Sequence, residues 1–175
     1  MRNALILMCF ICVMPFFTLA QVDFAKFYIG SSGCSIVAPG YMITDSTYSE
    51  DSSLIYSGEI ALDSFHFFII LVDIKNPIPD SGLARETVLV NYLDHLKSSF
   101  SITESVGYGR GHTLPGYDQA LGVLDYWKDE FGDSWSVKGW TDGRILAVLG
   151  IYGPVPYPHT SIENVYLNGF RFPGM

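Results

Sequence analysis

The chain of 175 residues contains few cysteines and no Asn-x-Ser/Thr glycosylation sequon. Two of its three cysteines, Cys9 and Cys12, lie in an apolar N-terminal stretch, and Cys34 is the third. If that stretch is removed, Cys34 has no partner in its own chain, which excludes an intramolecular disulfide. Because Cys34 lies in the apolar sequence CSIVAP, we expect a buried and unreactive thiol.

Basic residues are also scarce, since 10 Lys and Arg stand against 18 Asp and Glu, for a net charge of −8. A chain this acidic repels phosphate backbones, so we expect no nucleic-acid partner. The sequence has no H-E-x-x-H zinc motif and no G-x-S-x-G nucleophile elbow, and its four histidines lack metal-type spacing. We therefore expect neither a metal nor a cofactor, and no recognisable motif indicates an enzyme.

The first twenty residues, MRNALILMCFICVMPFFTLA, have the pattern of a secretory signal peptide. One basic residue, Arg2, precedes an apolar run, and Thr18 and Ala20 occupy the small-residue positions of a cleavage site. We predict cleavage after Ala20, which leaves one domain over residues 21–175. The alternative is a retained anchor, because the apolar run approaches the length of a membrane span. With cleavage, the sequence predicts a periplasmic or secreted bacterial protein with no membrane span.

The pattern of apolar residues predicts an α+β domain with an antiparallel sheet of six or seven strands. The run at 65–73 is apolar on both faces, which predicts a strand in the middle of the sheet. Residues 117–152 are predicted to form a three-stranded meander with a type I′ turn at Asp142-Gly143. Residues 41–53 are polar and acidic, so we expect an exposed loop there. Other strands are expected within 26–38, at 54–62, and at the edge at 170–172.

Two helices are predicted, one long and one short. Apolar residues recur with helical spacing over residues 82–99, which predicts an amphipathic helix there. Asp80 or Ser81 is suited to cap its N-terminus. The short helix is predicted to run from Thr160 to about Asn168.

This order of elements resembles the PsbP-like superfamily, which includes a lumenal photosystem II subunit and many exported bacterial proteins. The resemblance spans nearly the whole predicted mature chain and rests on the stretches SIVAPG, LVNYLDHL, LPGYDQALGVLDY, GRILAVLGIY and SIENVYLNGFRF. It implies an α/β/α sandwich around an antiparallel sheet. It also implies a binding or assembly role, since most characterised relatives have one. The resemblance assigns no site residue, because none of the family's functional motifs occurs in this chain.

The glycine-rich stretch GYGRGHTLPGYDQALG, residues 107–122, contains the first candidate binding residues. Arg110, His112, Tyr117 and Asp118 are side chains of the kinds that capture anions or perform acid–base chemistry. The stretch does not open onto a helix, so it is not a phosphate loop. The preferred interpretation is structural, a bend between two strands in which glycines supply positive φ and bulges.

Two tryptophans, Trp135 and Trp140, complete the candidate binding residues. They are an odd number of positions apart, so in a regular strand they face opposite sides of the sheet. One of them could be exposed and contact a sugar ring or a protein partner, although core packing is the default interpretation.

The remaining titratable residues are predicted to be structural. His66 is expected to be a hydrogen-bonded histidine at the start of a strand. The carboxylates around the hairpin KDEFGDS are expected to be solvated and not to form a calcium site; they are Asp125, Asp129, Glu130 and Asp133.

From these features we predict a non-catalytic exported module that binds a protein or a component of the cell envelope. The alternative is a secreted hydrolase or carbohydrate-binding protein with its site around residues 107–118. That alternative requires Arg110 and His112 to come together with carboxylates in one pocket.

Overall fold

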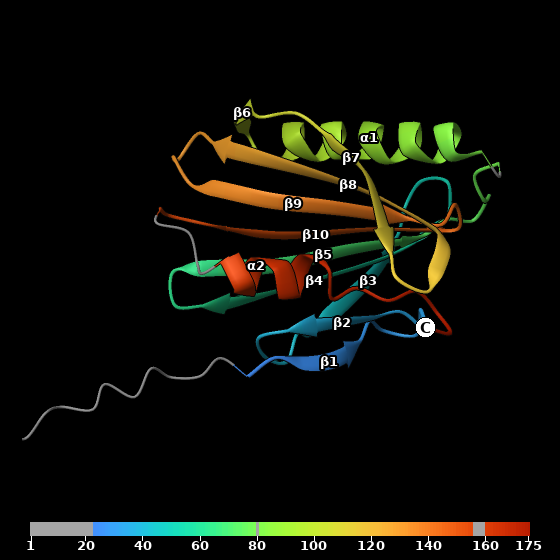
Figure 1. Ribbon diagram of the computed structural model, residues 1–175, viewed down its shortest axis with the longest axis horizontal. Helices are drawn as coiled ribbons and strands as arrows, with labels where there is room; N and C mark the ends of the chain where they lie inside the picture. The colour runs from blue at the N-terminus through green and yellow to red at the C-terminus, as the bar shows by residue number, and fades with distance from the viewer. Residues whose placement is uncertain (1–22, 80, 156–159) are drawn as a thin grey trace, which may run out of the picture.

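The computed structural model describes residues 23–79, 81–155 and 160–175, so the predicted signal peptide and the candidate cap Asp80 lie outside the described residues. Over these ranges the chain folds into ten strands and two helices, an α+β architecture (Figure 1). The helices are α1 (Gly82–Ser99) and α2 (Thr160–Leu167). The strands are β1 (Ala25–Tyr28), β2 (Ser35–Ala38), β3 (Thr44–Tyr48), β4 (Leu54–Leu62), β5 (Phe65–Asp73), β6 (Ile102–Ser105), β7 (Gly109–Leu114), β8 (Tyr117–Asp129), β9 (Ser134–Thr141) and β10 (Ile145–Gly153).

Within the described residues, eight strands form one sheet in the order β3-β4-β5-β10-β9-β8-β6, with β7 paired to β8 as well. Neighbouring strands run antiparallel. The predictions of a central strand at 65–73 and of a meander over 117–152 are confirmed, because β5 lies between β4 and β10 and β8, β9 and β10 pair in succession. Both faces of β5 and β10 are apolar, so each face of the sheet requires a cover.

Helix α1 covers one face of the sheet and packs mainly against β8, β9 and β6. Ser81 is its N-cap and accepts a hydrogen bond from the backbone N–H of Ala84 at 3.3 Å, which confirms one of the two predicted caps. Leu89, Leu93 and Leu96 are buried beneath the helix. Leu89 packs directly on Gly139 of β9, where an added Cβ would lie 2.6 Å from the Leu89 Cδ1. The glycine therefore allows the helix to approach the sheet closely.

The opposite face is covered by α2, by the small sheet of β1 and β2, and by the C-terminal residues (Figure 1). The Tyr166 hydroxyl of α2 is fully buried and donates to the backbone carbonyl of Phe68 at 2.7 Å. The predicted edge strand at 170–172 makes one bridge, between Arg171 and Ser35. Cys34 is fully buried in this layer, as predicted, and burial raises the pKa of its thiol to about 12.

Three sequence-based expectations about this fold are wrong. Residues 41–53 are not only a loop, because they contain β3. The main sheet has eight described strands, where six or seven were expected. The hairpin within 26–38 forms its own two-stranded sheet. Four of the five β3 residues are exposed, so the strand has no apolar face that a sequence pattern could reveal.

The turn at Asp142-Gly143 also differs from expectation, because only Gly143 has a positive φ, of 96°. A type I′ turn needs positive φ at both central residues. The Asp142 carboxylate instead accepts hydrogen bonds from the backbone N–H groups of Arg144 and Ile145, at 2.9 and 2.8 Å. A side chain therefore closes this turn.

Neither helix of the described residues combines the length and the apolar content that crossing a membrane requires.

A leucine pair on α1 tests how strongly the helix is anchored. We expect Leu89→Ala to lower the free energy of unfolding by about 2–5 kcal/mol, because it leaves a cavity above Gly139. Leu83→Ala is the matched control, since Leu83 is 75% exposed and Leu89 is 0% exposed. We expect the control to change stability by less than about 0.5 kcal/mol in urea denaturation. Equal losses in the two variants would contradict this description of α1.

Candidate functional site

The glycine-rich stretch forms β7 and its turn into β8. The pairing register shifts twice along β7, between Gly109 and His112 and again before Leu114. Gly111 and Gly116 have φ of 80° and 79°, values that favour glycine. The stretch is therefore a bulged strand and a turn, which agrees with its interpretation as a structural bend.

The four polar residues proposed from this stretch are not brought together. Arg110 pairs with Glu86 of α1, whereas His112 lies with its Nδ1 3.3 Å from the Nζ of Lys138. The Tyr117 hydroxyl donates to Asp142 at 3.1 Å. Asp118 is exposed. Each residue thus has different partners, and Tyr117 lines a separate pocket with Asp142 and Arg144.

Lys138 is the most unusual basic residue near this stretch, because it is only 4% exposed. Its ammonium lies 4.6 Å from the centre of the Trp140 ring and donates to Asn168 Oδ1 at 2.7 Å. Burial lowers the pKa of Lys138 to about 8. Burial and the nearby ammonium also lower the pKa of His112. Because the two basic groups are this close, a proton on one of them disfavours a proton on the other.

Both candidate tryptophans are buried, and they lie on opposite faces of the sheet as their spacing predicts. Trp140 belongs to the core beneath α2, and its Nε1 donates to the Leu167 carbonyl at 3.0 Å. Trp135 belongs to the core beneath α1, and its Nε1 donates to Asp129 at 2.9 Å. Trp135 also reaches a pocket.

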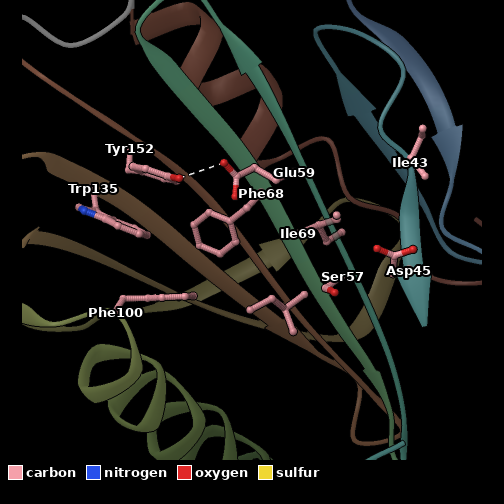
Figure 2. Close-up of a pocket in the computed structure, with 11 residues that line it drawn as sticks. Ile43, Asp45, Ser57, Glu59, Phe68, Ile69, Phe100, Trp135 and Tyr152 are labelled. Atoms are coloured by element: carbon pink, nitrogen blue, oxygen red, sulfur yellow. Dashed lines mark hydrogen bonds between the residues drawn. The ribbon is translucent and has the colours of Figure 1, made fainter. Parts of the chain in front are cut away.

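That pocket is a groove of about 500 Å³ on the face of the sheet that α1 leaves partly uncovered (Figure 2). We call it the β3–β5 groove. It lies between the C-terminal end of α1, represented by Phe100, and the edge strand β3. Ile43 and Asp45 line the groove at β3. Residues of β4, β5, β9 and β10 complete the lining; they include Ser57, Glu59, Phe68, Ile70, Trp135 and Tyr152.

One wall of the groove is a column of stacked rings. Trp135 stacks on Tyr152 at 4.1 Å between ring centres and on Phe100 at 5.2 Å. His66 stacks on the far side of Tyr152 at 4.7 Å. Phe68 meets Trp135 and Phe100 edge-on. Figure 2 shows Tyr152, Trp135 and Phe100 one above the other, so their edges and not their faces are directed to the groove.

Polar and acidic groups complete the groove, with Glu59 beside the Tyr152 end of the ring column and Asp45 and Ser57 on the β3–β4 side (Figure 2). Glu59 Oε1 accepts hydrogen bonds from the Tyr152 hydroxyl at 2.9 Å and from His66 Nδ1 at 2.6 Å, so Nδ1 carries the proton. This bond confirms the expectation that His66 is satisfied. Burial, followed by the bond and the charge of Glu59, raises the pKa of Tyr152. Asp45 and Ser57 are paired across β3 and β4 and are both exposed.

The carboxylates near the β8–β9 hairpin are not all solvated, which corrects the sequence-based expectation. Asp125 is fully buried and accepts hydrogen bonds from Lys97 at 2.9 Å and from Trp127 Nε1 at 2.7 Å. Asp129 is 6% exposed and accepts the Trp135 Nε1. Both stabilise buried indoles. Among the described residues, no group of three His, Cys, Asp or Glu side chains could hold a metal ion.

The chain matches no protein-family model, and no curated protein matches it in sequence.

Lys138 generates a prediction about pH. The unfolded chain keeps the lysine proton up to about pH 10.4, whereas the folded protein loses it near pH 8. Between these values the unfolded state binds more protons, so the free energy of unfolding rises with pH. We expect wild type to gain stability relative to Lys138→Met between pH 7 and pH 10, measured by denaturant unfolding.

The matched control is Lys128→Met, because Lys128 is on the exposed side of β8. Its stability relative to wild type should not change with pH over this range. If the difference in free energy of unfolding between wild type and Lys138→Met is constant from pH 7 to pH 10, the buried amine keeps its proton over this range.

Proposed function

We propose that this protein is a non-catalytic binding module of the periplasm or the cell exterior, and that the β3–β5 groove is its binding site. The observation that carries the proposal is the groove itself, about 500 Å³ in volume, with an apolar wall and a few polar groups. Ligand sites in proteins have this size and this mixture of surfaces. The N-terminal signal pattern supports export.

The layer arrangement supports the proposed relation to the PsbP-like sandwich. Helix α1 lies on one face of the antiparallel sheet, and α2 lies on the other (Figure 1). Most characterised members of that superfamily are binding or assembly factors. A binding role here agrees with that resemblance, although fold alone does not determine function.

The groove geometry favours binding over hydrolysis. Ser57 is opposite Ile70 in the β4–β5 register, and His66 is opposite Ala61. Four residues of strand separate these two positions, roughly 13 Å at about 3.3 Å per residue, so His66 cannot activate the Ser57 hydroxyl. Glu59 lies between them, and its Oε1 accepts the bonds from Tyr152 and His66.

The ring column disfavours carbohydrate as the ligand. A sugar ring binds by stacking on an open aromatic face. Trp135 has Tyr152 on one face and Phe100 on the other, and Tyr152 has His66 and Trp135. Neither ring therefore offers a platform for a sugar.

A fragment screen followed by amide chemical-shift mapping tests the site. We expect weakly bound apolar fragments to shift amide signals of β3, β4 and β5 around Ile43 and Phe68. Signals of residues 107–118 should stay unchanged. Fragments that shift only the 107–118 signals, or a screen without any hit, would count against the proposed site.

A pair of serine substitutions provides the control. Ser57→Trp should fill the groove and weaken fragment binding at least about tenfold, because an indole occupies the space of the ligand. Ser46→Trp places the same side chain on the opposite face of β3, since Ser46 is paired with the buried Tyr56. It should leave binding unchanged.

A further inference from the structure

We propose that the β3–β5 groove binds an organic cation with an apolar body, such as an alkyl or aryl amine, with the ammonium group beside Asp45 and the charge of Glu59 adding to the attraction. This inference rests on the proposed function, since it assigns a ligand class to the same groove. It is carried by the charges that line the groove and by the direction of its rings.

The polar groups of the groove accept hydrogen bonds and carry negative charge. Asp45 and Glu59 are the charged side chains of the lining, which contains no lysine or arginine among the described residues. Both hydrogen bonds to Glu59 end on Oε1, and Oε2 accepts none from the part of the chain that is described. Glu59 Oε1 also pairs with His66 when the imidazole is protonated, whereas Asp45 has no ion-pair partner within the described ranges. Asp45 and the Oε2 atom of Glu59 are therefore available to a ligand that donates hydrogen bonds.

The surroundings add to the negative potential of the groove. The charges of Asp133 and Asp129, after burial and Glu59, help to raise the pKa of the Tyr152 phenol, so they act on this wall. The basic side chains of neighbouring regions are engaged elsewhere. Lys97 pairs with Asp125, and Arg144 pairs with Asp73 at the far end of β5.

The ring column determines how such a ligand is oriented. Ring edges carry partial positive charge, so the column repels an ammonium group weakly and accepts hydrocarbon. A full charge beside a carboxylate at contact distance interacts more strongly than a charge beside a ring edge. The ammonium group therefore belongs on the β3–β4 side, beside Asp45, and the apolar body belongs against Trp135 and Phe100.

Three probes with one skeleton and different charges test this inference. They are 4-phenylbutylammonium, 4-phenylbutan-1-ol and 4-phenylbutyrate, titrated by calorimetry into the purified protein at pH 7. We expect the ammonium compound to bind at least about tenfold more tightly than the alcohol, and the carboxylate to bind most weakly. Raising the salt concentration from 50 to 500 mM should reduce the preference, because the carboxylates are at the solvent edge.

Two isosteric substitutions locate the charge. Asp45→Asn and Glu59→Gln should each weaken binding of the ammonium compound by about threefold to tenfold and leave alcohol binding unchanged. Asp118→Asn is the matched control, because Asp118 is exposed on β8 and does not line the groove. It should change neither affinity. Unchanged melting temperatures verify that the variants fold.

The outcomes separate this inference from the proposed function. If the alcohol binds as tightly as the ammonium compound and both shift the β3–β5 amide signals, the groove remains a site and the cation inference is overturned. If none of the probes binds while the fragment screen succeeds, the ligand class is again wrong. If the ammonium compound binds but Asp118→Asn weakens it as much as Asp45→Asn does, the attraction is that of the whole acidic protein and not of the groove.

Discussion

The pairing of β5 with β10 is the constraint on which the rest of this fold depends. Both strands are apolar on both faces, and they pair residue by residue from Ile145 opposite Asp73 to Tyr152 opposite His66. A sheet with such a centre needs a hydrophobic cover above and below. The chain supplies α1 for one face and supplies α2, the β1–β2 sheet and the C-terminal residues for the other. The groove exists because α1 packs over β8 and β9, and the β3–β4 side of the same face receives no helix among the described residues.

The sequence predicts those parts of the fold in which apolar periodicity is strong. The central strand, the meander and α1 are regular elements with long apolar patterns, and all three were predictable. The strands β3, β6 and β7 were not, because they are short or bulged and mostly exposed. A mostly exposed strand forms because its backbone pairs with the neighbouring strand. Its own side chains carry no apolar pattern that a sequence analysis can detect.

The groove could not be predicted for a different reason. Its residues come from segments far apart in the chain, and Glu59 and Tyr152, which share a hydrogen bond, are 93 positions apart. The spacing of Trp135 and Trp140 correctly predicts that they face opposite sides, but it does not show which rings stack on them. The carboxylates Asp125 and Asp129 appear solvated in a polar stretch of sequence, and only the structure shows that they accept hydrogen bonds from buried indoles.

The edge strand β3 is the least supported side of the groove. Among the described strands it is paired only with β4, so its backbone hydrogen bonds are among the first to break when the sheet fluctuates. Asp45 lies on β3, whereas Glu59 lies on the better supported β4. Because residues of β3 and β4 both line the groove, a ligand that filled it would link the edge strand to its better supported neighbour. Such a ligand would bind the paired form of β3, so it would also slow amide hydrogen exchange in that strand.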